Sequence, residues 1–430
     1  MKNEIDSHDD LYGAASPHEL AEQVMEDYKQ FLNPPLARVM KLSSSPVEVR
    51  AQGATIWDHN GRAYLDFAGG YGVFTLGHSH PRVIAAVTKQ MQMLSLSGKT
   101  MFNVMLGRAA RRLAEFAPGD LQISFWCNSG TEAVEGAIKL ARAASGRATI
   151  VATNDAYHGK TLGALSVSGR ETFQAPFRPL LEDVERVAYG DASVLDAALR
   201  GAAAFVVEPV QGEGGVNVPP LGYLRLVREA CDRTGALFIA DEVQTGLGRC
   251  GYRFGCDRDC VVPDIMTLAK GLSGGIVPVG AYIARAHVWN SAYAKAPLVH
   301  TSTFGGSEIA CAAALAAMDV LESEGLIENA RERGEQLLHG AIEVAAEFPT
   351  VIREARGLGL LVGVELTNEG YGGWIIPEML KAGVTAAWTL NAQRVIRLEP
   401  PLIVTESEVK RGLQALRAGV AAAAEKLGRL

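Results

Sequence analysis

Between residues 120 and 285 the chain alternates short apolar runs with segments that repeat apolar residues at helical spacing. Short, continuous apolar runs are typical of strands buried on both faces, and a segment such as "TEAVEGAIKLARAAS" has the period of a helix. Strands that alternate with helices predict a mostly parallel sheet that is covered on both sides. The predicted strands are "LQISFWC", "ATIVAT", "AAFVVEPV", "ALFIADEV", "DIMTLAK" and "VGAYIAR".

The pattern changes on either side of this region. Near the amino terminus, "HELAEQVMEDYKQFL" predicts one amphipathic helix, which we expect the Asn-Pro-Pro run at 33–35 to stop. Next, "ATIWDHNGRAYLDF" alternates and breaks at Asn60-Gly61, which predicts a hairpin. After residue 309 come long helices rich in Ala and Leu, two apolar strands and a last helix from Glu406, which predict a smaller α+β domain.

A chain of 430 residues is too long for one small core, so we expect several parts. They are an amino-terminal arm (1–45), a hairpin segment that joins the small domain (46–75), a large cofactor-binding domain (76–308) and a small carboxy-terminal domain (309–430).

Composition narrows the class of partner. Hydrophobic residues make up 48% of the chain and charged residues 21%, yet no apolar run reaches the length of a membrane span. The net charge is −7 and no basic stripe is present, so we expect neither a membrane nor a nucleic acid as partner. The charged start "MKNEIDSHDD" lacks the apolar centre of a secretory signal, and we expect a cytoplasmic protein.

One candidate function is that of a nucleotidase, because "ALFIADE" resembles a strand that holds magnesium through its terminal acids. That function requires the phosphate loop GxxxxGK[ST]. The chain has two GKT triplets, at 98–100 and 159–161, but Met93 and Asn154 occupy the positions where the first glycine is needed. The missing phosphate loop argues against the nucleotidase.

A second candidate function fits more of the chain. The predicted strand in "PDIMTLAKGLSGG" ends at Lys270, before a glycine-rich turn, and a lysine at a buried strand end must lose much of its hydration. An amine in such surroundings can form a Schiff base with an aldehyde, as pyridoxal 5'-phosphate (PLP) requires. Asp241 can supply the anion that PLP needs beside its pyridine nitrogen. Both would project from the carboxyl edge of the sheet.

The turn after "LQISFWC" offers a place for a phosphate. A helix is predicted to start near Thr131, so free backbone N–H groups and the hydroxyls of Ser129 and Thr131 would form an anion site. Taken alone, the same residues favour a simple helix cap, since Ser and Thr are common at that position. Tyr157, just after "ATIVAT", could stack on a cofactor ring or simply pack at a rim.

Seven motifs in order resemble one family. From about residue 35 to residue 425 the chain is similar to the class III, fold-type-I, PLP-dependent aminotransferases, which include the ornithine, acetylornithine, 4-aminobutyrate and putrescine enzymes. The resemblance implies a seven-stranded-type sheet in the large domain and a homodimer with its active sites at the interface, with a tetramer as an alternative. The motifs are "NSGTEAVE", "YHGKT", "VVEPVQGEGG", "IADEVQTGLGR", "TLAKGL", "HTSTFGGSEIACAAA" and "VIRLEPPLIVTESEV".

The resemblance implies a role for each matching residue. Lys270 matches the Schiff-base lysine, and Asp241 matches the partner of the pyridine nitrogen; we expect these two to be catalytic. Gln244 matches the side chain that bonds the ring hydroxyl, and Thr303 matches a threonine that reaches the phosphate from the other subunit. The expected cofactor contacts are Ser129, Gly130, Thr131, Tyr157, Asp241, Gln244, Lys270 and Thr303.

Further matches concern the substrate. Glu208 and Arg397 match a glutamate and an arginine that pair, and that open when a dicarboxylate needs the arginine. Arg397 could instead be a surface residue of an edge strand. At the position of Lys160, the ornithine and acetylornithine members carry arginine, whereas the putrescine enzymes carry lysine. Tyr71 matches the ornithine members instead.

We therefore expect a diamine aminotransferase. It would move a terminal amine from putrescine or cadaverine to 2-oxoglutarate or pyruvate in a ping-pong cycle. An ornithine, acetylornithine or other ω-amino acid aminotransferase stays open as an alternative, and so do a PLP decarboxylase and an aminomutase. The resemblance implies a structural turn, and no metal, for the histidines of "LGHSHP".

Overall fold

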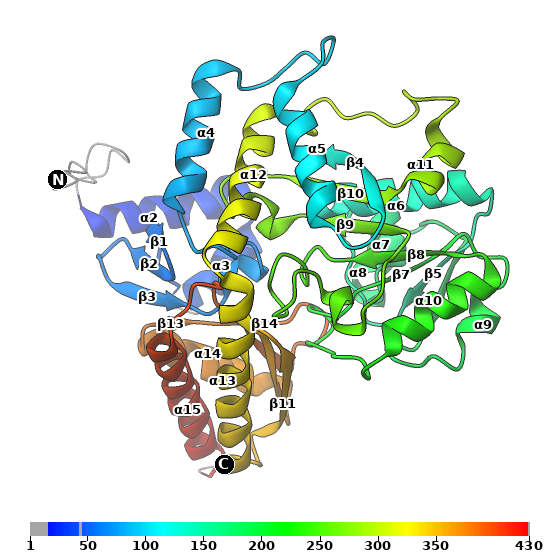
Figure 1. The fold of residues 1–430 in the computed structure, drawn as a ribbon. Helices are drawn as coiled ribbons and strands as arrows, with labels where there is room; N and C mark the ends of the chain where they lie inside the picture. The colour runs from blue at the N-terminus through cyan, green and yellow to red at the C-terminus, as the bar shows by residue number, and fades with distance from the viewer. Residues whose placement is uncertain (1–15, 43–44, 429–430) are drawn as a thin grey trace.

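The computed structural model describes residues 16–42 and 45–428. Three sheets organise the chain: one of seven strands, shown mainly in cyan and green in Figure 1, and two of four strands, one built mainly from residues 48–66 and the other from residues 352–398. Residues 1–15 and 43–44 of the predicted arm lie outside the described residues. Among the described helices, none combines the length and the apolar composition that crossing a bilayer requires.

The large sheet has the strand order β4-β10-β9-β8-β7-β5-β6. Strands β9, β8, β7, β5 and β6 pair in parallel, whereas β10 runs antiparallel to both of its neighbours. The predicted mostly parallel sheet is confirmed. Its strands are β4 (Leu121–Cys127), β5 (Ile150–Thr153), β6 (Val184–Val187), β7 (Ala204–Val207), β8 (Leu237–Asp241), β9 (Ile265–Leu268) and β10 (Gly280–Arg285).

Helices cover both faces of this sheet. Successive strand residues point to opposite faces, and in β8 the side chains of Phe238 and Ala240 belong to one apolar core while Ile239 belongs to another. Helix α6 (Gly130–Ser145) contributes to the core that contains Ile239, whereas α5 (Val104–Phe116) and α10 (Tyr223–Thr234) contribute to the opposite one. Burial on both faces explains why the strands are apolar along their whole length.

Strand β6 was missed by the sequence pattern. It is the last strand in the sheet order, and its central residues, Glu185 and Arg186, are exposed. An edge strand needs only one paired neighbour and one buried face. It therefore lacks the continuous apolar run by which the other strands were recognised.

The predicted hairpin is confirmed and belongs to a second sheet. Strands β2 (Thr55–Asp58) and β3 (Ala63–Asp66) pair antiparallel, and β1 (Glu48–Gln52) flanks β2. The short strand β13 (Val384–Thr385) pairs in parallel with β3, with Val384 opposite Leu65. Segments more than 300 residues apart thus share one sheet.

The third sheet has the order β11-β12-β15-β14 and is antiparallel. Helix α13 (Leu326–Glu347) packs against β11, β12 and α15 (Glu406–Leu427), and α14 (Gly372–Lys381) packs against α15. Figure 1 shows α13 and α15 side by side at the carboxy-terminal end. The predicted last helix begins at Glu406, capped by Thr405 and Glu408. The strands are β11 (Ile352–Leu358), β12 (Leu361–Leu366), β14 (Ala387–Trp388) and β15 (Val395–Leu398).

The arm differs from the prediction of one helix. Helix α2 (Pro17–Asp27) continues as one π-helical turn to Leu32, and Asn33 ends it in an extended conformation. A second helix, α3 (Pro34–Leu42), begins directly at Pro34. Proline stops a helix from within but is favoured in its first turn, where its missing N–H has no partner to lose. The prolines were therefore a start signal as well as a stop.

The other helices connect these sheets. Helix α12 packs against α4 and α5 and leads into α13. The predicted domain limits at 75/76 and 308/309 stay predictions. The helices are α4 (Pro81–Met93), α7 (Leu162–Val167), α8 (Glu171–Gln174), α9 (Leu195–Ala198), α11 (Ala286–Tyr293), α12 (Glu308–Ser323), α13 (Leu326–Glu347), α14 (Gly372–Lys381) and α15 (Glu406–Leu427).

Candidate active site

A cavity of about 610 Å³ opens where strands of the large sheet end. Strands β8 and β9 are parallel and in register, with Asp241 opposite Thr267, so the residues that follow each strand emerge at the same edge. The turns after β4, β5 and β7 reach the same cavity. Eight of the predicted site residues line it: Ser129, Gly130, Thr131, Tyr157, Glu208, Asp241, Gln244 and Lys270.

Lys270 begins a short 3₁₀ turn two residues after β9 ends. Its φ is 47°, an uncommon left-handed conformation for a residue with a side chain. Burial lowers the pKa of its ammonium, and the carboxylates of Glu399 and Glu213 oppose that shift. Among the described residues its ammonium has no hydrogen bond or ion pair. A desolvated lysine without a fixed partner is chemically suited to act as a nucleophile.

Asp241, the last residue of β8, is 3% exposed, and both of its carboxylate oxygens have hydrogen-bond partners. Its Oδ1 accepts from the Thr267 hydroxyl at 2.8 Å and from the Val243 N–H at 3.1 Å. Its Oδ2 lies 2.6 Å from Nδ1 of His158. A buried carboxylate with this many donors is held in one orientation at the cavity wall.

Sequence reasoning missed His158, which comes directly after Tyr157 at the end of the β5 region. Burial disfavours charge on its ring, but the hydrogen bond to Asp241 and the negative charges of Asp241 and Glu208 together outweigh burial and raise the pKa of His158. Its Nε2 is buried and has no partner among the described residues. The available signal was its place in "YHGKT", where a polar ring follows a buried strand.

The start of α6, where an anion site was predicted, lines the cavity. Ser129 caps the helix by accepting from the Glu132 N–H at 3.3 Å. Within the described residues, the N–H groups of Gly130 and Thr131 have no hydrogen-bond partner, and both residues line the cavity. Gly159 has a φ of 130°, and a Cβ there would overlap the Thr131 side chain. Cap and anion site are therefore compatible properties of one helix end.

Tyr157 and Lys160, both in the loop after β5, line the cavity but differ in exposure. Tyr157 is partly buried and its N–H donates to Glu208 at 2.9 Å. Lys160 is exposed, and its Nζ lies 3.9 Å from the ring centre of Phe173. A lysine in this position presents a point charge rather than a planar fork of donors.

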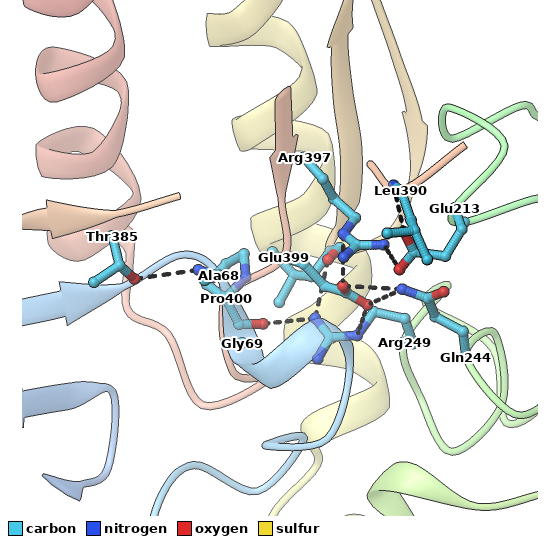
Figure 2. A network of polar contacts seen from close by, with 12 residues as sticks. Ala68, Gly69, Glu213, Gln244, Arg249, Thr385, Leu390, Arg397, Glu399 and Pro400 are labelled. Carbon is cyan, nitrogen blue, oxygen red and sulfur yellow. Dashed lines mark hydrogen bonds and ion pairs between the residues drawn. The ribbon is translucent and has the colours of Figure 1, made fainter. Parts of the chain in front are cut away.

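The predicted pairing of Glu208 with Arg397 is wrong. Glu208 accepts from the backbone of Tyr157 and Gly212, and burial raises its pKa to about 7. Nη1 of Arg397 instead donates to Oε1 of Glu213 at 2.6 Å (Figure 2). Both glutamates lie in "EPVQGE", and only the fold decides which one faces β15.

Arg397 is not on an edge strand. It lies in β15, which pairs with β12 on one side and β14 on the other, and it is 1% exposed. Its Nε lies 3.1 Å from Oε2 of Glu399. Its Nη2 is buried without a partner among the described residues.

Glu399 contacts Arg397, the predicted site residue Gln244, and Arg249, which was not predicted. It is fully buried, and both of its oxygens accept from Nε2 of Gln244 at 3.0 and 3.1 Å. Nε of Arg249 lies 3.6 Å from Oε1 of Glu399, and this arginine donates to the carbonyl groups of Leu360 and Pro400. Figure 2 shows these side chains converging on Glu399.

Three predicted residues do not line the cavity: Arg397, Tyr71 and Thr303. Tyr71 is 54% exposed and its ring centre lies 5.3 Å from the Arg397 guanidinium. Thr303 is exposed, in the loop before α12. The structure thus brings Tyr71 to Arg397 and leaves Thr303 apart from the cavity of its own chain.

A lysine, a buried acid and a helix start at one edge of a mostly parallel sheet define the class: an α/β, fold-type-I, PLP-dependent transferase. The family model for class III aminotransferases matches residues 40–420. The chain belongs to the class III aminotransferases.

Solved structures agree with this family. The chain is 34% identical to the ornithine aminotransferase from Toxoplasma gondii (TM-score 0.87, covering 94% of this chain and 95% of that one). It is 32% identical to an amine transaminase from an uncultivated Pseudomonas species, determined in its PLP-bound form (TM-score 0.82, 88% and 95%). It is also 32% identical to the acetylornithine aminotransferase from Elizabethkingia anophelis (TM-score 0.81, 93% and 99%). The cofactor of this enzyme is PLP.

Proposed function

We propose that this aminotransferase takes its amine from a diamine of the putrescine or cadaverine type and passes it to a 2-oxo acid such as 2-oxoglutarate or pyruvate. The observation that carries the donor assignment is Lys160. Its ammonium lies over the ring of Phe173. It cannot make the bidentate contact that arginine makes with a carboxylate. A donor without a carboxylate needs no such contact, so lysine in place of arginine does not weaken its binding.

Several features of the cavity support the proposed cofactor contacts. The unpartnered N–H groups of Gly130 and Thr131 suit a phosphate. Asp241, held by three donors, can keep a pyridine nitrogen protonated, and the ring of Tyr157 offers an apolar face. The amide of Gln244 lines the same cavity. The residues present fit PLP.

When bound, PLP supplies the carbonyl that condenses with the donor amine and the ring that takes up its electrons. We assign the proton transfer to Lys270. Its ammonium has no competing partner among the described residues, and burial lowers its pKa, so it can give and take a proton at the donor carbon. Asp241 stays oriented at the cavity wall by its three hydrogen bonds. Arg397 binds the carboxylate of the 2-oxo acid once Glu213 releases Nη1.

Tyr71 favours a second candidate function. The resemblance assigns tyrosine at this position to ornithine members, and here its ring lies beside Arg397. The alternative is an ornithine, acetylornithine or other ω-amino acid aminotransferase. Such an enzyme would have the same fold, cofactor and chemistry as a diamine aminotransferase. The two differ in whether the amine donor carries a carboxylate.

We also propose that the enzyme is a homodimer in which Thr303 reaches the phosphate site of the partner subunit, with a tetramer as the alternative. Leu298, Val299 and Phe304 in the same segment are 82%, 62% and 60% exposed. Such a group of exposed apolar side chains is typical of an interface. Light scattering tests the assembly, and an active monomer would contradict it. We expect a cytoplasmic enzyme, which cell fractionation tests.

A donor panel tests the proposed function. Diamines, ω-amino acids, ornithine and N-acetylornithine are assayed with 2-oxoglutarate and with pyruvate, and the aminated product is quantified against donor consumed. We expect a diamine to give the highest kcat/KM, with one amine transferred per donor. If N-acetylornithine or ornithine exceeds every diamine, the second candidate is correct. Donor consumption without amination of the acceptor would indicate a decarboxylase or an aminomutase.

A further inference from the structure

Four buried charged side chains form a group beside the cavity, which we call the arginine–glutamate cluster: Glu213, Arg249, Arg397 and Glu399 (Figure 2). The two arginines and the two glutamates cancel in formal charge. Each glutamate contacts Arg397, Glu213 at Nη1 and Glu399 at Nε. Charges buried together interact strongly because little water screens them. The net charge of this cluster therefore matters to any ligand that approaches Arg397.

The two glutamates are anchored differently. Glu213 lies in the loop between β7 and α10, where its second oxygen accepts from the N–H of Leu390 at 2.7 Å. Glu399 follows β15 directly, and its own N–H donates to the carbonyl of Phe67 at 2.8 Å. The backbone of Gly69 lies so close that a Cβ there would overlap the Glu399 carbonyl oxygen. Glu399 is thus the more firmly held of the two.

Glu399 also has more partners for its charge. Arg397, Arg249 and Gln244 all approach its carboxylate, from β15 and from the loop after β8. Its negative charge is the largest charge effect on both neighbouring cations: it opposes the fall in the pKa of Lys270 and raises the pKa of Arg397 against burial. The charge of Glu399 therefore reaches from the substrate-side arginine to the reactive lysine.

We propose that Glu399 is a specificity-determining residue that excludes donors with a distal carboxylate and admits donors with a distal ammonium. With both glutamates in place, Arg397 is compensated and attracts no further carboxylate. When Glu213 releases Nη1 for the 2-oxo acid, Glu399 stays on Nε and the cluster carries one positive charge. This inference rests on the proposed diamine function, since it explains how one arginine serves the acceptor without recruiting amino-acid donors.

A neutral substitution isolates this charge. Glu399→Gln keeps the size of the side chain and an oxygen that can accept from Gln244, but leaves the cluster with one positive charge while Glu213 is still in place. That charge attracts a distal carboxylate and repels a distal ammonium. A merely structural role of Glu399 would lower activity toward both kinds of donor alike.

The test compares cadaverine with 5-aminopentanoate, which have the same chain length and differ in the distal group. With pyruvate as acceptor, the ratio of kcat/KM for cadaverine to that for 5-aminopentanoate is expected to fall about tenfold or more in Glu399→Gln. A second readout needs no turnover: calorimetric titration with glutarate, a dicarboxylate that cannot react, is expected to show tighter binding to the variant. An unchanged ratio with unchanged glutarate affinity overturns the proposal.

A matched control is Glu242→Gln. Glu242 is buried next to Asp241 but binds the Thr245 hydroxyl and the N–H groups of Gly255 and Cys256, and it does not line the cavity. Its substitution removes a buried carboxylate without touching the cluster, so the donor ratio is expected to stay as in the wild type. An equal shift in this control overturns the proposal.

A second variant covers the case in which Glu399→Gln does not fold. Glu399→Asp keeps the negative charge but places it farther from Arg397, because the side chain is shorter. The ratio of kcat/KM for cadaverine to that for 5-aminopentanoate is therefore expected to fall, but by less than in Glu399→Gln. No fall in the ratio overturns the proposal. The proposed function fails separately: if the wild type prefers ornithine to diamines, the donor assignment is wrong, while a shift of the ratio in the variants still supports the role of Glu399.

Discussion

Two buried sets of charged groups meet at the cavity, and they are built in different ways. Asp241 and His158 belong to the large sheet and the turn beside it, and one hydrogen bond of 2.6 Å links them. The arginine–glutamate cluster combines β15 of the third sheet with loops that follow β7 and β8. The first set is rigid because one sheet carries it. The second depends on how two parts of the molecule pack.

This difference assigns separate tasks to the two sets. Groups fixed by one sheet suit the chemical step, which requires constant geometry. Groups shared between parts of the molecule suit selection, because an ion pair between them can open for a ligand. We therefore expect substitutions in the first set to lower kcat, and substitutions in the cluster to change KM and donor preference.

The largest effect is expected from Lys270→Ala. Loss of the amine removes the group that gives and takes the proton, so turnover should fall by at least about 10³-fold. The visible absorbance that PLP owes to its linkage with the lysine should also disappear. Single-turnover assays and absorption spectra check both, with Lys410→Ala as a control, because Lys410 is 63% exposed and, in the part of the chain that the structure describes, its ammonium pairs only with Glu406. A yellow and active Lys270→Ala enzyme would end the assignment.

Asp241→Asn tests the set formed by Asp241 and His158. Replacing the buried anion with a neutral amide removes the charge that the cavity holds for the cofactor ring, and we expect kcat to fall about 10²-fold or more. Donor KM should change little, because the cluster is untouched. Steady-state kinetics measures the two constants separately. A change confined to KM would place Asp241 with the selecting groups instead.

Arg397→Met tests the arginine–glutamate cluster. The acceptor loses a charge-assisted contact, so KM for 2-oxoglutarate and pyruvate should rise about 10- to 100-fold while the amine half-reaction continues. The buried Glu213 loses its arginine and Glu399 loses one of its two, so the free energy of unfolding should fall by about 3 kcal/mol. Half-reaction kinetics and denaturant titration check these effects. For comparison, Arg353→Met breaks an ion pair whose arginine is 64% exposed, and almost no loss is expected.

The smallest effect concerns pH. Burial opposes charge on His158, but Asp241 raises its pKa above the ordinary value of 6.5 in the folded state. A raised folded-state pKa stabilises the protein below the unfolded pKa, and the stabilisation is lost as pH rises through the folded pKa. The stability difference between wild type and His158→Gln should be greatest below pH 6.5 and shrink above it. Denaturant titrations at a series of pH values check this, and a constant difference contradicts it.

Much of the fold followed from local pattern. The strands of the large sheet were recognisable because burial on both faces requires apolar runs, and the hairpin because Asn60-Gly61 allows a tight turn. Strand β6 escaped because an edge strand needs less apolar surface. The predicted stop at residues 33–35 was right, but the helix that begins at Pro34 was missed, because proline is also favoured in the first turn of a helix.

For the site, the sequence by itself determined the groups that directly follow a strand. Lys270, Asp241 and the start of α6 lie at one edge because parallel strands end there together. Only the tertiary structure decided the partners of Arg397, since it and Glu213 are 184 residues apart and two nearby glutamates are chemically equivalent in sequence. The contact of His158 with Asp241 was decided in the same way. Hydrogen bonds depend on orientation in space, which apolar periodicity does not encode.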